Sequence, residues 1–317
     1  MSIKSLEEYK DAYKQSLSSP AYWEKLAQGF TWMKPFDQVM KGGFDGDTHI
    51  EWFSGGELNI TVNALDRHLK NQGEKIAIHF EPNDPKENAR SFTYKQLAER
   101  VNQFANVLKK QNVKKGDVVC FYMAMVPELL IGVLACARIG AVHNVVFGGF
   151  SATSLATRMQ DSSACLLVTQ DGGFRCDKIV PLKNIADEAL ASCPKVQTVL
   201  VFERTGEKVS MQSGRDHKLT PLLDASEKNC APEKMSSEDP LFIVYTSGST
   251  GKPKGLLHTT AGYMMWAAEP YKQVFQMKET DLYWCTAELG WVTGHSYIAY
   301  GPLLNGAKIG RASCRER

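Results

Sequence analysis

LFIVYTSGSTGKPKG, residues 241–255, joins an apolar run to a loop rich in glycine, serine and threonine. The run LFIVYT (241–246) is typical of a buried strand. In the loop after it, glycines allow main-chain N–H groups to turn toward an anion without hindrance from a Cβ atom, and the hydroxyls add further donors. Lys252 and Lys254 supply positive charge. A solvated surface turn is the alternative, but so many donors directly after a buried strand favour a phosphate-binding loop.

The loop differs at two positions from the Walker A motif, in which G-x-x-x-x-G-K is followed by Ser or Thr. Thr246 stands where the first glycine is required, and Pro253 follows Lys252. Proline cannot donate an amide to a helix interior, and GLLHTT (255–260) has the pattern of a second short strand. We therefore expect a hairpin-like loop that clasps phosphate groups, with these binding residues: Thr246, Ser247, Gly248, Ser249, Thr250, Gly251 and Lys252.

Upstream of the loop, short apolar runs alternate with segments of helical periodicity. The expected strands are KIAIHF (75–80), VVCFYM (118–123), AVHNVV (141–146), ACLLVT (164–169) and TVLVFE (198–203), and the expected helices lie near 94–108, 127–138, 151–160 and 182–192. This alternation predicts an α/β fold of mostly parallel sheets covered by helices on both faces. Residues 205–238 lose the apolar periodicity and predict a surface connection between two subdomains.

Composition excludes several classes of partner. Among 317 residues, 37 Lys and Arg nearly balance 35 Asp and Glu, so no overall field attracts the chain to nucleic acid or an anionic membrane. The start, MSIKSLEEYK, lacks the apolar run of a secretory signal. The eight cysteines form no C-x-x-C pair and resemble reduced core residues, and none is spaced with a histidine as metal ligands are. We expect a cytoplasmic protein with no Cys or His metal site and no obligate protein partner.

YTSGSTGKPKG (245–255) resembles the signature loop of the adenylate-forming, or AMP-binding, enzymes, which include acyl-CoA synthetases, peptide-synthetase adenylation domains and luciferases. WFSGGELNITVNALDRHL (52–69) and VVFGGFSATSLATRMQDSSACLLVT (145–169) resemble the short-chain branch, the acetyl-CoA synthetases and their propionate relatives. The resemblance implies the large amino-terminal domain of that family in truncated form. It divides the chain into an amino-terminal extension at 1–60 and an incomplete AMP-binding domain at 61–308.

The resemblance also implies an activity. Acetate and ATP would form acetyl-adenylate and diphosphate, with Mg²⁺ bridging phosphate oxygens, and CoA would then take the acetyl group and release AMP. The family's catalytic lysine, ribose-binding Asp and adenine pocket lie downstream of this chain, so we expect the chain itself to be inactive, with Thr246 and Lys252 its only residues that act in catalysis. A propionate or mixed short-chain ligase and a non-catalytic nucleotide-binding fragment are the alternatives.

Two further segments carry site residues by the same resemblance. GWVTGHSYIAYGPL (290–303) resembles the acetate-site segment, in which Trp291 gates the nucleotide side and Val292 and Thr293 line the acyl pocket. Thr293, where propionate enzymes more often carry Val, favours acetate. A packed helix start is the alternative for this segment, and His295 is expected to be structural with its ring nitrogens bonded within the fold.

DGGFRCDKIVPLK (171–183) falls where the family has a basic loop that contacts the phosphates of CoA. Arg175 and Lys178 retain the charges, but Cys176 and Asp177 stand where two glycines are usual. A solvated turn is the alternative. The residues expected to bind CoA are Arg175, Cys176, Asp177, Lys178 and Thr293.

The last residues depart from the family pattern. After NGA (305–307) the family continues into an apolar strand, whereas IGRASCRER (309–317) follows here. Read as the codons ATC GGA AGA GCG TCG TGT AGG GAA AGA, this segment resembles a common sequencing-library adapter. We therefore expect the natural sequence to stop near Ala307 and residues 309–317 to be an artefactual tail.

Overall fold

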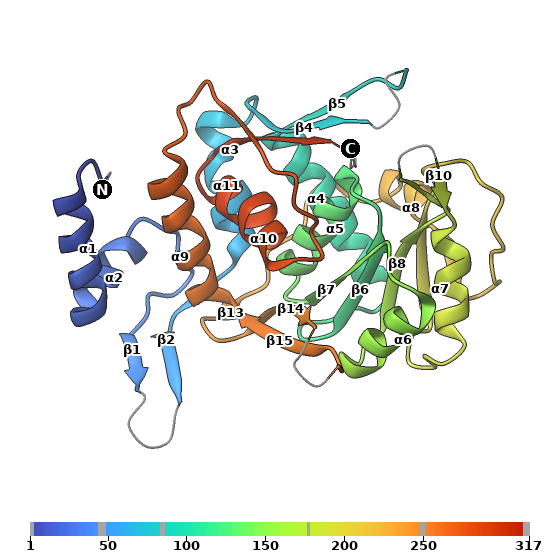
Figure 1. Ribbon diagram of the computed structural model, residues 1–317, viewed down its shortest axis with the longest axis horizontal. Helices are drawn as coiled ribbons and strands as arrows, with labels where there is room; N and C mark the ends of the chain where they lie inside the picture. Colours follow the sequence, from blue (N-terminus) through green and yellow to red (C-terminus); the bar gives the residue numbers. More distant parts are fainter. Residues whose placement is uncertain (1–2, 44–48, 83–85, 176–177, 248–250, 313–317) are drawn as a thin grey trace.

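The computed structural model describes residues 3–43, 49–82, 86–175, 178–247 and 251–312. Its largest sheet has seven strands in the order β12-β11-β8-β6-β7-β14-β15 (Figure 1). All neighbours in it are parallel except β14 and β15. The strands are β12 (Asp216–Lys218), β11 (Thr198–Phe202), β8 (Leu166–Gln170), β6 (Val118–Met123), β7 (Val142–Phe147), β14 (Pro240–Thr246) and β15 (Lys254–Thr259).

A second sheet has four strands in the order β16-β17-β4-β5, and three two-stranded pairs lie outside both sheets. The strands of the second sheet are β16 (Leu282–Trp284), β17 (Lys308–Ala312), β4 (Ile76–Glu81) and β5 (Arg90–Thr93). The pairs are formed by β1 (Gln38–Gly42) with β2 (Ile50–Ser54), β3 (Glu57–Leu58) with β13 (Met235–Ser236), and β9 (Gly173–Arg175) with β10 (Lys178–Val180). The expected strand 75–80 therefore lies in a different sheet from the other expected strands.

The helices end close to the expected residues where their periodicity was strong. They are α1 (Leu6–Ser18), α2 (Pro20–Ala27), α3 (Arg67–Gln72), α4 (Tyr94–Lys110), α5 (Pro127–Arg138), α6 (Ala152–Asp161), α7 (Leu182–Leu190), α8 (Leu219–Asp224), α9 (Thr260–Pro270), α10 (Val292–Gly294) and α11 (Gly301–Leu304), with π-helical segments at Val62–Asp66, Tyr271–Phe275 and His295–Tyr300. Within the described ranges, no helix has the length and apolarity needed to cross a lipid bilayer.

Side chains of β6 alternate between two apolar clusters, as successive residues of a strand must. Val119, Phe121 and Met123 belong to the cluster that α4 and α5 help to form, whereas Cys120 and Tyr122 belong to the cluster with α6 and α7. Helices thus cover both faces of the sheet. The predicted α/β class with mostly parallel, helix-covered strands is confirmed.

The hairpin expected around the phosphate loop is also confirmed. Strand β14 pairs with β15 in antiparallel register, Tyr245 opposite Gly255 and Thr246 opposite Lys254. On its other side β14 pairs in parallel with β7, Phe242 opposite His143. The loop therefore connects two neighbouring strands of the large sheet.

The prediction that residues 205–238 connect two subdomains is wrong. This segment contains β12, α8 and β13, and it leads from β11 to β14, which belong to the same sheet. The apolar periodicity is weak because the elements are short. Which strands share a sheet depends on contacts between residues far apart in the sequence. A local change in composition does not predict such contacts.

Strand β17 begins at Lys308 and lies between β16 and β4, with Ile309 opposite Ile78 and buried. The backbone here therefore continues the sheet in the way that the family pattern predicts for this position. The expectation that residues 309–317 have an artefactual origin concerns their source, which strand pairing does not test, and it stays a prediction.

Candidate functional site

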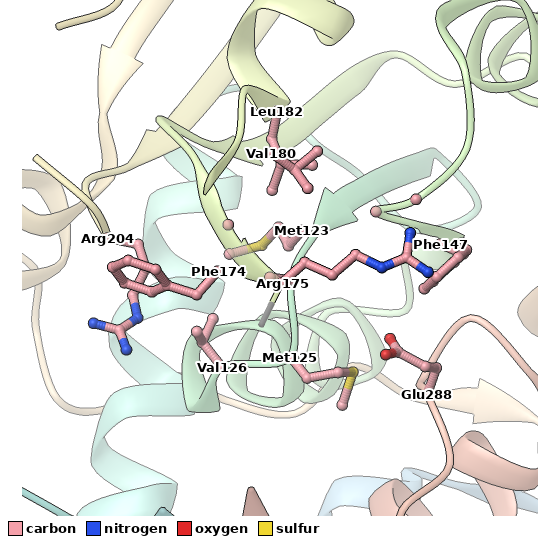
Figure 2. A pocket seen from close by; sticks show the side chains of 14 residues that line it. Met123, Met125, Val126, Phe147, Phe174, Arg175, Val180, Leu182, Arg204 and Glu288 are labelled. Carbon is pink, nitrogen blue, oxygen red and sulfur yellow. The ribbon is translucent and has the colours of Figure 1, made fainter. Parts of the chain in front are cut away.

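A cavity of about 60 Å³ lies at the carboxyl ends of β6, β7 and β8 (Figure 2). This edge is where ligands bind in open parallel α/β sheets. The residues that line it are Met123, Ala124, Met125, Val126, Phe147, Gly148, Gly149, Gly173, Phe174, Arg175, Val180, Leu182, Arg204 and Glu288. Most of the wall is apolar, and the charged groups come from three separate segments.

The turn that follows β7 forms one wall and depends on its glycines. A Cβ atom on Gly149 would lie 2.4 Å from the Phe147 ring, and one on Gly148 would lie 3.1 Å from the Met123 carbonyl oxygen. The hydroxyl of Tyr122 donates a hydrogen bond of 2.6 Å to the carbonyl of Phe150. Burial raises the pKa of Tyr122 to about 12, so the hydroxyl remains a donor at neutral pH. The turn is thereby held against the end of β6.

The expected coenzyme loop forms a second wall. Arg175 ends β9, and Lys178, which begins β10, pairs opposite it. Both are exposed, and the Arg175 guanidinium lies 6.0 Å from the centre of the Phe147 ring. Cys176 and Asp177, which come between Arg175 and Lys178 in the sequence, lie outside the described residues. The structure thus brings Arg175 into the cavity wall, with Lys178 on the neighbouring strand.

The segment expected to bind the acyl group begins beside this cavity. Glu288 lines it, the main-chain N–H of Leu289 lies 3.4 Å from the Met125 sulfur, and a Cβ on Gly290 would lie 3.2 Å from the Phe147 nitrogen. The chain then passes directly to Trp291, which is 52% exposed.

Val292 and Thr293 are likewise exposed at the start of α10. Val292 lines a second, open depression of about 490 Å³ together with Trp52 and Trp266. Most of the residues that line this depression are apolar. The roles of Trp291, Val292 and Thr293 as pocket residues stay predictions.

The described residues of the phosphate loop are exposed at and beyond the end of β14. Thr246, Ser247, Gly251 and Lys252 all face solvent, and Gly251 has a φ of 79°, which glycine adopts at little cost. The remaining expected members, Gly248, Ser249 and Thr250, lie outside the described residues. An anion can therefore reach the hydroxyls of Thr246 and Ser247 and the ammonium of Lys252.

A row of side chains connects the phosphate loop to the cavity. The Arg158 guanidinium lies 5.5 Å from the centre of the Tyr245 ring and 4.5 Å from that of Phe150, and Phe150 packs edge-on against Phe147. The Tyr245 hydroxyl donates to Asp161 at 2.6 Å. Burial, together with this contact, raises the pKa of Tyr245. Phosphate loop, coenzyme hairpin and acyl segment thus converge on one region.

Sequence reasoning missed four residues of this region. Glu288 and Arg204 line the cavity, Arg158 bridges two rings, and Asp171 hydrogen-bonds the turn that carries Arg204. A local signal existed only for the Phe147 turn, where two glycines directly follow a buried strand. The four charged residues lie on separate elements, so no sequence spacing indicated that they meet.

Among the residues that the structure describes, no disulfide joins two cysteines, and no three His, Cys, Asp or Glu side chains are grouped to hold a metal ion. Burial raises the pKa of Cys120 and Cys136, which keeps them as thiols in the core.

Two family profiles match the chain. The profile described as AMP-binding enzyme matches residues 65–316, and that described as acetyl-coenzyme A synthetase N-terminus matches residues 9–64. Among curated relatives, the acetyl-coenzyme A synthetases of Syntrophus aciditrophicus and Photobacterium profundum are 49% and 50% identical over 300 and 305 residues. These alignments cover 94% and 95% of this chain but 46% and 47% of the relatives, so the chain spans about half their length.

A solved structure gives the same picture of the fold. The acetoacetyl-CoA synthetase from Streptomyces lividans matches with a TM-score of 0.84 at 22% sequence identity. The match covers 93% of this chain and 44% of that one. At 22% identity this similarity supports the fold of the chain and says nothing of its substrate or its site residues.

Proposed function

Since this chain belongs to the AMP-binding enzyme family, we propose that the protein containing it is an acetate–CoA ligase, which forms acetyl-CoA, AMP and diphosphate from acetate, ATP and CoA. The relatives that are 49% and 50% identical are named acetyl-coenzyme A synthetases. The observation that carries the proposal is the convergence of three segments. Arg175 of the coenzyme hairpin and Glu288, just before the acyl segment, line one cavity. The row of contacts from Phe150 through Arg158 to Tyr245 connects this cavity to the phosphate loop.

In the first step a carboxylate oxygen of acetate would attack the α-phosphorus of ATP, and the bond from that phosphorus to the diphosphate would break. Both reactants are anions, so the site must neutralise charge and align them. Thr246, Ser247 and Lys252 supply hydroxyl donors and one positive charge at the exposed end of β14. These residues would hold the terminal phosphates as diphosphate leaves. No covalent nucleophile from the protein is needed.

Mg²⁺ fits this loop only in part. The described side chains of the loop offer hydroxyl oxygens as ligands but no carboxylate, and the Lys252 ammonium cannot bind a cation. A Mg²⁺ ion would therefore be held mainly by phosphate oxygens, whose charge it would neutralise. The loop residues would bind and orient the phosphates themselves.

In the second step the CoA thiolate would attack the carbonyl carbon of acetyl-adenylate. The thiol proton would first pass to solvent; the carbon–sulfur bond would then form, the bond from the carbonyl carbon to the phosphate oxygen would break, and AMP would leave. Arg175 and Lys178 stand at paired positions where they would bind CoA phosphates by charge. Coenzyme binding at this cavity would bring the thiol toward the segment that follows Glu288.

Acetate is the proposed acid because the relatives that are 49% and 50% identical are named acetyl-coenzyme A synthetases, and because Thr293 stands where propionate enzymes more often carry Val. Propionate is the alternative substrate, and a purely nucleotide-binding role is the alternative function. The substrates are small molecules, and the buried thiols fit a reducing cytoplasm.

The proposal is tested by separating the two steps in the full-length protein. With acetate, ATP and Mg²⁺ but no CoA, labelled diphosphate should exchange into ATP. Adding CoA should then give AMP and acetyl-CoA in equal amounts. An exchange that requires CoA, or ADP in place of AMP, would exclude the adenylate route. ATP binding with no exchange would favour the nucleotide-binding alternative.

A further inference from the structure

The carboxylate of Asp171 is buried between two segments behind the cavity. Asp171 directly follows β8 and is 1% exposed. One carboxylate oxygen accepts main-chain N–H groups from Gly172 at 2.7 Å and Arg204 at 2.8 Å, and the other accepts one from Gly206 at 2.7 Å. The N–H of Thr205 lies 3.1 Å from both oxygens. A buried carboxylate is stable only when its oxygens are satisfied in this way.

The turn held by Asp171 supports the coenzyme hairpin. Arg204 lines the cavity, its guanidinium lies 5.0 Å from the centre of the Phe174 ring, and it forms an ion pair of 2.7 Å with Glu87. Phe174 directly precedes Arg175 on β9. Figure 2 shows Arg204 and Phe174 side by side at one end of the cavity. Phe174 therefore packs against Arg204, and the main-chain N–H groups of the turn that carries Arg204 are bonded to the Asp171 carboxylate.

The hairpin base and the turn are also in close contact. A Cβ atom on Gly172 would lie 2.8 Å from the Thr205 hydroxyl oxygen and 2.8 Å from the Ile179 side chain. Neither Asp171 nor Gly172 is among the residues that line the cavity. Asp171 can therefore affect a bound molecule only through the elements that it holds.

We propose that Asp171 is a positioning residue for coenzyme binding. Its carboxylate fixes the turn at 204–206 against the β9–β10 hairpin, so that Phe174 and Arg175 keep their places in the cavity wall. This inference rests on the proposed function, because it assumes that CoA binds at this cavity. It does not involve the phosphate loop, which lies on β14 and β15.

The test uses Asp171→Asn in the full-length protein. Asparagine keeps the shape but replaces one acceptor oxygen with an NH₂ group, which would face the N–H groups of Gly206 and Thr205. Small displacements of positioning groups cost up to about 100-fold in rate. We expect the KM for CoA to rise roughly 10- to 100-fold, while acetate-dependent diphosphate exchange without CoA stays at the parent rate.

Asp216→Asn is the matched control. The Asp216 side chain is also fully buried and accepts a main-chain N–H, from Gln212 at 2.9 Å, besides pairing with Lys183 and Arg215. It lies on β12, the edge strand, and does not line the cavity. The control should leave the KM for CoA unchanged. An equal rise in both variants, or an unchanged KM in Asp171→Asn, would overturn the inference.

Arg175→Ala separates this inference from the proposed function. If it leaves the KM for CoA unchanged, the assignment of CoA to this cavity fails. If it raises the KM while Asp171→Asn does not, only the positioning role fails. Should Asp171→Asn not fold, Arg204→Met removes the guanidinium between Glu87 and Phe174 and leaves the Asp171 hydrogen bonds intact. A KM for CoA unchanged in that variant would also contradict the positioning role.

Discussion

Lys252 lies exposed on the loop beyond β14, where its ammonium is open to an anion. In the full-length protein we expect Lys252→Ala combined with Thr250→Ala to slow acetate-dependent diphosphate exchange by at least roughly 100- to 1000-fold, since the loss of a single electrostatic donor costs about that much. Thermal stability should change little, because Lys252 is exposed. Lys109→Ala, an exposed lysine in the last turn of α4, is the control. An unchanged exchange rate in the double variant would show that the loop does not bind the phosphates of ATP.

Val292 is 41% exposed and lines the apolar depression beside Trp52 and Trp266. In the full-length protein, Val292→Gly should enlarge the acyl pocket and raise kcat/KM for longer acids relative to acetate. A methylene in such a pocket changes the free energy by about 1–3 kcal/mol, so the shift should be roughly 10- to 200-fold at most. Competition assays with acetate, propionate and butyrate measure it, and a variant with the parent preference would locate the acyl pocket elsewhere.

His295 is a buried titratable residue next to the acyl segment. Its ring stacks against those of Phe242 at 4.4 Å and His143 at 5.2 Å, and its Nδ1 lies 3.0 Å from the carbonyl oxygen of Trp291. Its Nε2 has no partner among the described residues, so the expectation that both ring nitrogens are bonded holds for one of them. Burial lowers the pKa of His295 to about 4.

The lowered pKa makes stability depend on pH. Above the unfolded pKa of about 6.5, neither state of His295 binds a proton and its full contribution to stability is present. Between about 6.5 and 4, the unfolded chain takes a proton that the folded core excludes, so stability falls as pH falls, by on the order of 3 kcal/mol. Urea titrations at pH 7.5 and 5.5 should show a smaller loss for His295→Gln than for the parent chain. If the free energy of unfolding falls equally in both proteins, the folded protein can protonate His295 as readily as the unfolded chain can.

At the scale of elements, the β14–β15 hairpin leaves β15 at the edge of the large sheet. Leu256 and Leu257 on β15 are 50% and 55% exposed. An apolar edge strand favours pairing with another chain. We expect the 317-residue chain to self-associate at micromolar concentration, and Leu257→Lys to reduce this by adding a charge to the edge. Sedimentation velocity of the two chains measures the difference, and a parent chain that stays monomeric would contradict it.

Elements with strong local patterns were predictable from sequence. The helix α5 has the predicted bounds of 127–138, and β6 has the bounds of its apolar run, because burial on both sides imposes a continuous apolar stretch. The β9–β10 hairpin and the sheet that contains β4 were not predictable. Strand β4 pairs with β17, whose residues lie far away in the sequence, and no local pattern encodes such a pairing.

The candidate site shows the same limit. Lys252 and Arg175 could be found because each lies in a motif with a recognisable order of residues. Asp171 could not, because its role depends on the amides of the turn at 204–206, which the fold alone brings to it. Motifs identify the groups that meet a ligand, whereas the groups that hold them in place are visible only in three dimensions.

At the scale of the whole molecule, the chain spans about half the length of its relatives. Trp266, Trp291 and Val292 are exposed, and Trp266 and Val292 line the open depression. We expect the 317-residue chain alone, given acetate, ATP, Mg²⁺ and CoA, to produce no acetyl-CoA. Turnover near that of the full-length protein, measured as AMP release, would show that the described residues suffice for the reaction.

The most direct test of the central claim is the product analysis of the full-length protein. With ATP, Mg²⁺, CoA and acetate, acetyl-CoA and AMP should form in equal amounts, and kcat/KM should be higher for acetate than for propionate, which would give propionyl-CoA. A protein that forms no thioester from acetate, or that prefers propionate, would contradict the assignment as an acetate–CoA ligase.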